Sequence, residues 1–342
     1  PMLENAGATV LLPRERDIQE HEVVVDNDTI HGASAMVIVN GRNTWERSES
    51  PGFLIKDTLH TGENPFTMGS YMKIEALPDD TAMLKYIPEI PESGEYAIYI
   101  SWGREEGSRD DVPCDVYHTG GRTRFFLNQT MGAGTWIYLG TFYFHQGTDP
   151  QKGSVIVYGS GRKGVITADA VRFGGGMGNV ARKPGNGFSY TVSGKPRWME
   201  GSRYYLQYAG MPDTLVYTLN KGQNDYNDDY MSRGEWVNYL LGSPSGPTKN
   251  PAEKGLNIPV ELALAFHTDA GVTWSDSVIG TLGIYSTFKN NGLFPSGRSQ
   301  MASRDLTDII QSQVVSDIGT LFDPEWTRRA IWDKQYSEAW RP

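Results

Sequence analysis

The sequence predicts an α/β domain, with a mostly parallel sheet and helices on both faces, that is interrupted by an inserted all-β sandwich or jelly roll. Residues 178–342 alternate between helical and strand patterns, which is typical of a parallel sheet covered by helices. Residues 23–177 carry short alternating runs at a spacing of roughly 10 residues, which is typical of a sandwich. Because residues 1–22 also show a helix and strand pattern, the sandwich is predicted to be inserted into the α/β domain.

The two flanks supply the elements of the predicted α/β domain. Residues 1–22 begin with the tail of a helix that stops at a glycine, followed by a strand over residues 8–12. In the second flank, periodicity predicts helices over 197–209, 226–241 and 303–321 and strands over 214–219, 260–266 and 279–286. The helix over 303–321 is the clearest, with Ser303 as its N-cap.

The middle region supplies the strands of the predicted sandwich. Alternating runs occur at residues 96–102, 114–117, 124–128, 136–144, 154–158 and 165–173. No helical periodicity stands out between them. The joins to the flanks are expected near residues 22–26 and at the glycine-rich stretch 174–178.

The composition and charge of the chain argue against several classes of function. The formal net charge of −10 argues against nucleic acid or an anionic membrane surface as the main partner. No stretch approaches the ~20 apolar residues that a membrane-spanning helix needs. The single cysteine, Cys114, excludes an intrachain disulfide and a cysteine-based zinc cage within this sequence.

His267 is the candidate site residue that stands out most. It follows the apolar run 260–266, which predicts a buried strand, and it opens the polar segment 268–271. Ligands and metals gather at the carboxyl ends of strands in open α/β sheets, so an imidazole there can bind a metal or move a proton. The alternative is a histidine that caps the strand and hydrogen-bonds to backbone.

The α/β flanks resemble the zinc-dependent N-acetylmuramoyl-L-alanine amidases. The resemblance rests on residues 3–17 (a helix, a glycine, a strand, then Arg14-Glu-Arg-Asp17), on Ala265-Phe-His267-Thr-Asp-Ala, and on Ile279-Gly-Thr-Leu-Gly-Ile-Tyr285. It implies a zinc held by two histidines and a glutamate, with a further glutamate as general base on the zinc-bound water.

The amidase resemblance implies that the site is incomplete in this sequence. His267 takes the place of one zinc ligand, and Asp269 can orient its imidazole or form a turn. The other histidine and the glutamate ligand are expected before residue 1, and the general base beyond Pro342. The catalytic residues are therefore unknown, and we expect a chain clipped at both ends of its active site.

The middle region resembles the carbohydrate-binding-like domain shared by golvesin and xanthan lyase. The matching segments are residues 90–102, Asn128-Gln129, residues 134–142 and Ala168-Asp-Ala-Val-Arg-Phe173. This resemblance implies a sandwich that binds glycans. It says little about chemistry, because binding modules occur beside unrelated enzymes.

Tryptophans are the first candidates for a sugar contact. Trp45 lies in a loop rich in polar residues, where its ring can stack on a sugar. Trp102 and Trp136 lie inside strand patterns, where a tryptophan more often belongs to the core.

For several other polar residues, the sequence allows both a structural and a functional role. His21 and His31 lie where the insertion departs and can approach the site, whereas His60, His118 and His145 are expected on the surface or across strands. Arg14 and Asp17 suit an ion pair or a substrate contact. The stretch 224–229 suits helix capping in a solvated loop, or calcium.

Three functions remain in view. The leading hypothesis is a zinc-dependent amide hydrolase acting on peptidoglycan or a related cell-wall peptide and carrying a glycan-binding module. The alternative is a non-catalytic surface protein that binds glycans, and a third, weaker hypothesis is a polysaccharide lyase such as xanthan lyase. An extracytoplasmic location, in the periplasm or at the cell surface, follows from the resemblance alone.

Overall fold

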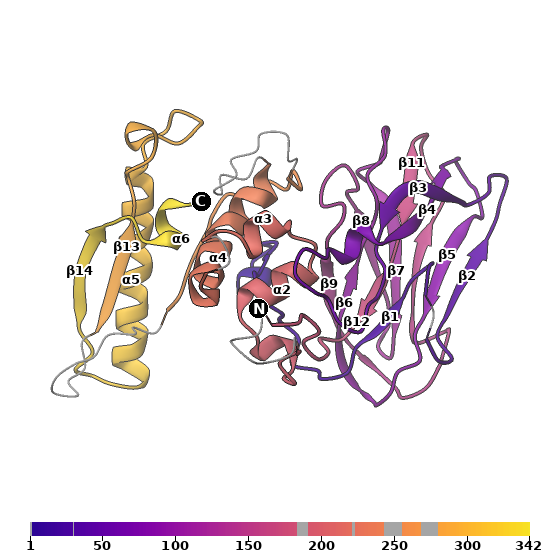
Figure 1. The fold of residues 1–342 in the computed structure, drawn as a ribbon, viewed down its shortest axis with the longest axis horizontal. Helices are drawn as coiled ribbons and strands as arrows, with labels where there is room; N and C mark the ends of the chain where they lie inside the picture. The colour runs from indigo at the N-terminus through magenta and orange to yellow at the C-terminus, as the bar shows by residue number, and fades with distance from the viewer. Residues whose placement is uncertain (1, 30, 183–190, 221–222, 243–254, 268–279) are drawn as a thin grey trace.

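The computed structural model describes all residues except 1, 30, 183–190, 221–222, 243–254 and 268–279. Three layers of different character follow one another along the longest axis (Figure 1). A β-sandwich lies on one side and a group of helices covers it. A helix with two parallel strands lies at the far end. No described helix is long and apolar enough to cross a membrane.

The sandwich is built from antiparallel strands between Val23 and Phe173. One main sheet has the order β1 (Val23–Val25), β12 (Val171–Phe173), β6 (Gly94–Ile100) and β9 (Ile137–Phe144). The facing sheet has the order β2 (Ala35–Val39), β5 (Met83–Ile87), β10 (Ser154–Tyr158), β7 (Val112–His118) and β8 (Gly121–Leu127). A smaller sheet comprises β11 (Val165–Ala168), β4 (Gly69–Glu75) and β3 (Glu46–Gly52).

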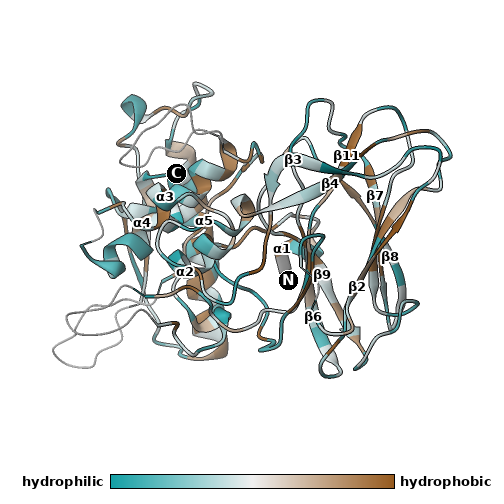
Figure 2. Ribbon diagram, turned by 45° about the vertical axis from the view of Figure 1, so that its right-hand side comes forward, coloured by the Kyte–Doolittle hydropathy of each residue, from teal (hydrophilic) through white to brown (hydrophobic). Residues whose placement is uncertain are grey.

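Strand β6 shows how two cores meet in this region. Tyr96, Ile98 and Ile100 point into the core between the two main sheets. Ala97 and Tyr99 point the other way, into a second core shared with the helices. The strand is therefore buried on both faces, although it belongs to an antiparallel sheet. Figure 2 shows hydrophobic residues along the strands of the sandwich.

The covering helices close the second core. They are α2 (Ser202–Tyr208), α3 (Asp213–Val216) and α4 (Asp225–Leu241), with the short helix α1 (Met2–Asn5) at the start of the chain. Short 3-10 turns, η1 (Pro65–Thr67), η2 (Arg197–Met199) and η3 (Asn290–Gly292), lie elsewhere. Helix α2 ends at Tyr208 and is followed by Gly210, whose φ of 86° suits a glycine.

The far end holds a β-α-β unit. Strands β13 (Thr281–Tyr285) and β14 (Arg328–Asp333) pair in parallel, and α5 (Met301–Leu321) connects them and packs on them. The last helix, α6 (Ser337–Trp340), packs against α4. We call β13, α5 and β14 the C-terminal unit.

Several predictions for the flanks are wrong. The described residues do not form one mostly parallel sheet with helices on both faces. Among their named strands, β13 and β14 pair in parallel, and the other pairs are antiparallel. Residues 8–12 form no strand, and residues 214–219 contain helix α3, because Leu215 and Val216 are buried in the second core. Ser303 lies inside α5, which has Gln300 as its N-cap.

The predicted buried strand over 260–266 is also wrong. These residues form no strand, and Leu262, Leu264 and Phe266 are 46%, 42% and 74% exposed. Val260 packs against the second core, but the rest of the run has no strand beside it in the described part of the chain and stays exposed.

Most of the remaining elements match the sequence pattern. The strand predictions between residues 96 and 173 are confirmed by β6 to β12, and the helix over 226–241 by α4. The strand near 279–286 is confirmed by β13, and the helix after residue 197 corresponds to η2 and α2. The sequence pattern does not predict strands β1 to β5, which precede residue 90.

Candidate functional site

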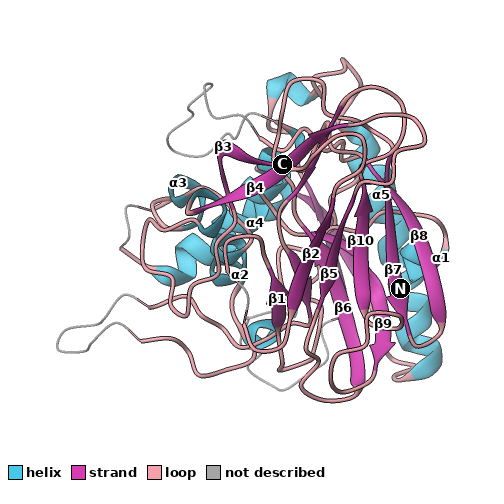
Figure 3. Ribbon diagram, turned by 90° about the vertical axis from the view of Figure 1, so that its right-hand side faces the viewer, coloured by secondary structure: helices cyan, strands magenta, loops and turns pink. Residues whose placement is uncertain are grey.

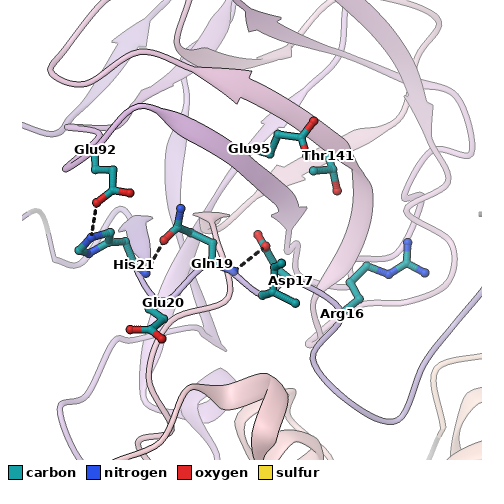
Figure 4. Close-up of a pocket in the computed structure, with 9 residues that line it drawn as sticks. Arg16, Asp17, Gln19, Glu20, His21, Glu92, Glu95 and Thr141 are labelled. Carbon is teal, nitrogen blue, oxygen red and sulfur yellow. Dashed lines mark hydrogen bonds and ion pairs between the residues drawn. The ribbon is translucent and has the colours of Figure 1, made fainter.

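A groove of about 670 Å³ runs between the segment 16–21 and the ends of β6 and β9 (Figure 4). We call it the groove. It is lined by Arg16, Asp17, Ile18, Gln19, Glu20, His21, Glu92, Glu95 and Thr141. Segments far apart in sequence therefore meet at one open hollow on the sandwich.

The wall formed by residues 16–21 is held by a series of short-range hydrogen bonds. The backbone N–H of Gln19 donates to Asp17 Oδ1 at 2.9 Å, and that of His21 donates to Gln19 Oε1 at 3.0 Å. Asp17 Oδ2 accepts from the backbone N–H of Ala97 on β6 at 2.6 Å. These bonds fix the wall against the sheet, so the groove is preformed.

The charged groups of the groove differ in how firmly they are held. Burial raises the pKa of Asp17, and the backbone hydrogen bonds from Ala97 and Gln19 only partly oppose this. Arg16 forms an ion pair with Glu4 at 2.7 Å and lies 3.9 Å above the Tyr138 ring. At the mouth, His21 Nε2 and Glu92 Oε2 approach to 3.4 Å, and both side chains are exposed.

The chemistry of the groove suits hydroxyl groups. Gln19 and Thr141 carry both donors and acceptors, and Glu20 and Glu95 carry strong acceptors at the surface. The carboxyl groups of the lining outnumber its cations, so a neutral, hydroxyl-rich ligand fits better than an anionic one.

A second, smaller hollow of about 240 Å³ lies beside the ends of β3 and β4. Phe66, Tyr71 and Trp102 line it together with Arg104 and Asp169. Trp102 is only 3% exposed, and its indole N–H donates to Met131 O at 3.0 Å, so its main role is packing.

Buried carboxyl groups lie behind this hollow. Asp169 is 1% exposed and accepts from the Phe53 N–H at 3.0 Å, while burial raises its pKa to about 7. Asp26 is 0% exposed, and its carboxyl oxygens have no hydrogen-bond partner among the described residues. Burial and the nearby Asp169 raise the pKa of Asp26 to about 8.

His267 does not occupy the strand-end position predicted from the sequence. Its side chain is 46% exposed, and Nε2 lies 3.6 Å from Oε1 of Glu338, which also pairs with Arg233 at 3.0 Å. Asp269 lies outside the described residues. The premise of a buried strand before His267 is therefore wrong, and its role as a zinc ligand stays a prediction.

The described residues do not fit a catalytic zinc centre. Such a centre needs three protein ligands, and no group of three or more His, Cys, Asp and Glu side chains in the described ranges can hold a metal ion. Beside His267, Glu338 is already shared with a guanidinium. We therefore derive no step through zinc.

The structure places the candidate tryptophans inside the protein. Trp45, predicted to lie in a polar loop with its ring free to stack on a sugar, is instead 6% exposed and belongs to the core between the sheets. Trp136 is 5% exposed and packs edge-on against Phe53 and Phe66. Because the Trp45 ring is buried, it has no free face on which a sugar could stack.

Other polar candidates from the sequence make structural hydrogen bonds and ion pairs. Arg14 donates to Ser202 Oγ at 3.0 Å and lies 4.0 Å from Asp229, so the predicted ion pair with Asp17 is wrong. Asn224 caps α4 by accepting from Tyr226 N and Asn227 N, which confirms the capping interpretation of residues 224–229. His21 lines the groove, and His31 is exposed.

Sequence reasoning missed the polar residues of the groove. Glu95 and Thr141 are exposed positions on neighbouring strands, since Thr141 pairs with Ala97 in the register of β6 and β9. In the sequence they look like any solvent-facing strand residues. Only the path of segment 16–21 over this edge gives them a common site.

Residues 60–175 match the family described as Golvesin C-terminal domain. A xanthan lyase of Bacillus sp. (strain GL1) is 31% identical over 154 residues, which cover 44% of this chain and 14% of that protein. The chain thus spans a small part of the length of this curated relative. The predicted resemblance of the sandwich to the golvesin and xanthan lyase domain is confirmed.

Among solved structures, a Paenibacillus xanthan lyase matches with a TM-score of 0.34 and 25% identity, over 45% of this chain and 13% of that chain. A family 35 carbohydrate binding module from Clostridium thermocellum matches with a TM-score of 0.21 and 17% identity, over 41% of this chain and 97% of the module.

Proposed function

We propose that this chain is a glycan-binding protein and that the groove on its sandwich holds the glycan. The observation that carries the proposal is the 31% identity, over 154 residues, to a protein named for its action on a polysaccharide. The matched stretch is a small part of that enzyme. The proposal therefore concerns binding rather than polysaccharide cleavage.

The groove supports a neutral glycan as the ligand. Sugar hydroxyls both donate and accept, and the half-buried Gln19 and the exposed Glu95 and Thr141 offer matching groups on opposite walls. The fixed backbone of residues 17–21 means that little ordering is needed on binding.

Native affinity electrophoresis of the whole chain tests this proposal, with soluble mannan, hydroxyethylcellulose and dextran in the gel and a peptidoglycan pull-down in parallel. Glu95→Ala is expected to weaken binding roughly tenfold, because a hydrogen bond to a charged acceptor is lost. Glu106→Ala, an exposed carboxylate outside the groove, is the matched control and is expected to bind normally. Equal retardation of both variants would show that the groove is not the site.

The zinc-dependent amide hydrolase stays a prediction from the sequence, and the similarity to a xanthan lyase supports the glycan-binding alternative instead. An extracytoplasmic location remains part of the proposal, because polysaccharides of the kind tested lie outside the cell. Peptidoglycan is kept as one of the glycans whose binding is tested.

A further inference from the structure

The five-stranded sheet has an outer face that is turned away from the covering helices. Figure 3 looks onto this sheet, with β2, β5, β10, β7 and β8 side by side. The inner residues of these strands, such as Leu84, Val155 and Cys114, belong to the core between the sheets. Their neighbours Lys85, Ile156 and Asp115 must therefore point outward.

The strand register arranges the outer residues in rows. Lys85 pairs with Ile156, Ile156 with Asp115 and Asp115 with Arg124, so these four side chains cross the sheet in one row. On one side of this row, Pro113 of β7 pairs with Phe126 of β8. On the other side, Tyr117 of β7 pairs with Arg122 of β8. Tyr158 lies on the same face of β10.

Asp115 anchors the cations of this face. It is 0% exposed and accepts from Arg124 Nε and Nη2, both at 2.7 Å, and from the Tyr158 hydroxyl at 2.9 Å. Arg122 Nη1 lies farther away, at 3.6 Å. Burial opposes the ionisation of Asp115, but these hydrogen bonds and the two arginines outweigh it and hold its pKa below the ordinary value.

The face carries excess positive charge on an acidic protein. Lys85, Arg122 and Arg124 face a single anion, Asp115, which leaves two net positive charges, whereas the whole chain carries −10. The nearby Asp111 is already paired with Arg109 and Arg162 and so does not cancel this excess. The side chains of Arg122 and Arg124 are 53% and 43% exposed, so their charges are accessible.

Aromatic rings lie among these cations. Phe126 is 67% exposed beside Arg124, and Tyr117 and Tyr158 are partly exposed on the neighbouring strands. A flat sheet face that offers ring surfaces and guanidinium groups together suits an extended chain of sugar rings bearing carboxylates.

We propose that this outer face binds an anionic polysaccharide whose sugars carry carboxylates, that is, a polyuronate. The face is separate from the groove, which is acidic and suits neutral glycans. The two surfaces would allow the protein to hold two chemically different polysaccharides at once.

Affinity electrophoresis with polygalacturonate in the gel tests this proposal on the whole chain. The double variant Lys85→Gln/Arg122→Gln removes two cations and leaves the Asp115–Arg124 pair intact. It is expected to bind roughly tenfold more weakly. The matched control, Arg304→Gln/Lys334→Gln, loses the same charge in and beside the C-terminal unit and is expected to bind as the unchanged protein does. Binding is also expected to weaken with added NaCl.

The outcomes are distinguishable. Equal retardation of the two double variants, or no retardation by polygalacturonate, overturns the proposal, as does retardation by dextran sulfate alone. The Glu95→Ala variant, run in the same gels, is expected to keep polygalacturonate binding. If neutral glycans bind and polygalacturonate does not, only the outer face is excluded as a site; binding to neither also excludes the groove.

Discussion

The sandwich and the C-terminal unit use apolar residues in opposite ways. In the sandwich, β6 is buried on both faces and its residues belong to two cores. In the C-terminal unit, Gln311 is the one buried residue of α5, and Ile309, Leu321 and Phe322 at its surface are 67%, 70% and 81% exposed. Apolar side chains therefore form a large buried core in the sandwich, whereas those named on α5 stay exposed.

This difference has a consequence for stability. Burial of apolar surface is the main favourable term in folding, so the sandwich and its covering helices should hold most of the free energy of unfolding. The C-terminal unit should contribute little and open at lower denaturant concentration.

The largest expected effect is a cavity in the sandwich core. Phe144 is 0% exposed and packs edge-on against Tyr96 and Phe173. Phe144→Ala is expected to lower the free energy of unfolding by about 3–5 kcal/mol. Urea denaturation followed by tryptophan fluorescence measures this; a loss below about 1 kcal/mol would contradict the two-core description.

The next effect concerns the join between sandwich and helices. Arg172 on β12 is 0% exposed, forms an ion pair with Glu15 at 2.6 Å and lies 3.8 Å above the Tyr99 ring and 5.3 Å above the Tyr208 ring of α2. Arg172→Met is expected to cost about 3 kcal/mol, because Glu15 is left as an uncompensated buried charge.

A double variant separates charge from packing at this join. Arg172→Met/Glu15→Gln is expected to recover part of the loss in the same denaturation measurement, since no buried charge then remains unpaired. Strictly additive losses would mean that Arg172 acts through its contacts with the rings rather than through Glu15.

The sequence could predict the sandwich because its strands alternate in two-residue steps. Cys114, Val116, Val155 and Val157 face the core while their neighbours face outward, and this pattern is visible without a structure. The golvesin-like segments lie in the same stretch. Strand β3 could not be predicted because it reads Glu-Arg-Ser-Glu-Ser-Pro-Gly, which carries no apolar alternation.

The candidate site could not be predicted for a different reason. An apolar run is a signal for burial only where another element covers it, and Leu262, Leu264 and Phe266 before His267 are exposed. The groove and the outer face depend on which strands pair, as when β8 places Arg124 beside Asp115. Pairing of that kind is set by the tertiary fold.

A smaller effect is expected from the buried carboxyl groups. The pKa of Asp26 is raised to about 8 and that of Asp169 to about 7, both mainly by burial, so the folded state keeps protons that the unfolded state releases near pH 4. The stability that they contribute is fully present below pH 4 and is lost as the pH rises through 7 and 8.

Thermal unfolding between pH 6 and pH 9 measures this effect. The unchanged protein is expected to lose on the order of 1–3 kcal/mol over this range. Asp26→Asn removes one ionisable group at nearly constant volume and is expected to flatten the profile, whereas Glu106→Gln, an exposed control, is expected to leave it unchanged. A profile that is equally steep in Asp26→Asn would exclude Asp26 as its source.

The smallest expected effect completes the comparison of the two regions. Phe322, at the C-terminal end of α5, is 81% exposed, so Phe322→Ala removes the same ring as Phe144→Ala from a site without a cavity. The change in the free energy of unfolding is expected to stay within about 0.5 kcal/mol, as for other surface substitutions. The same urea denaturation measures it. A loss comparable to that of Phe144→Ala would mean that a further surface covers α5 in solution, and the contrast between the two regions would then reflect a missing partner rather than weak packing.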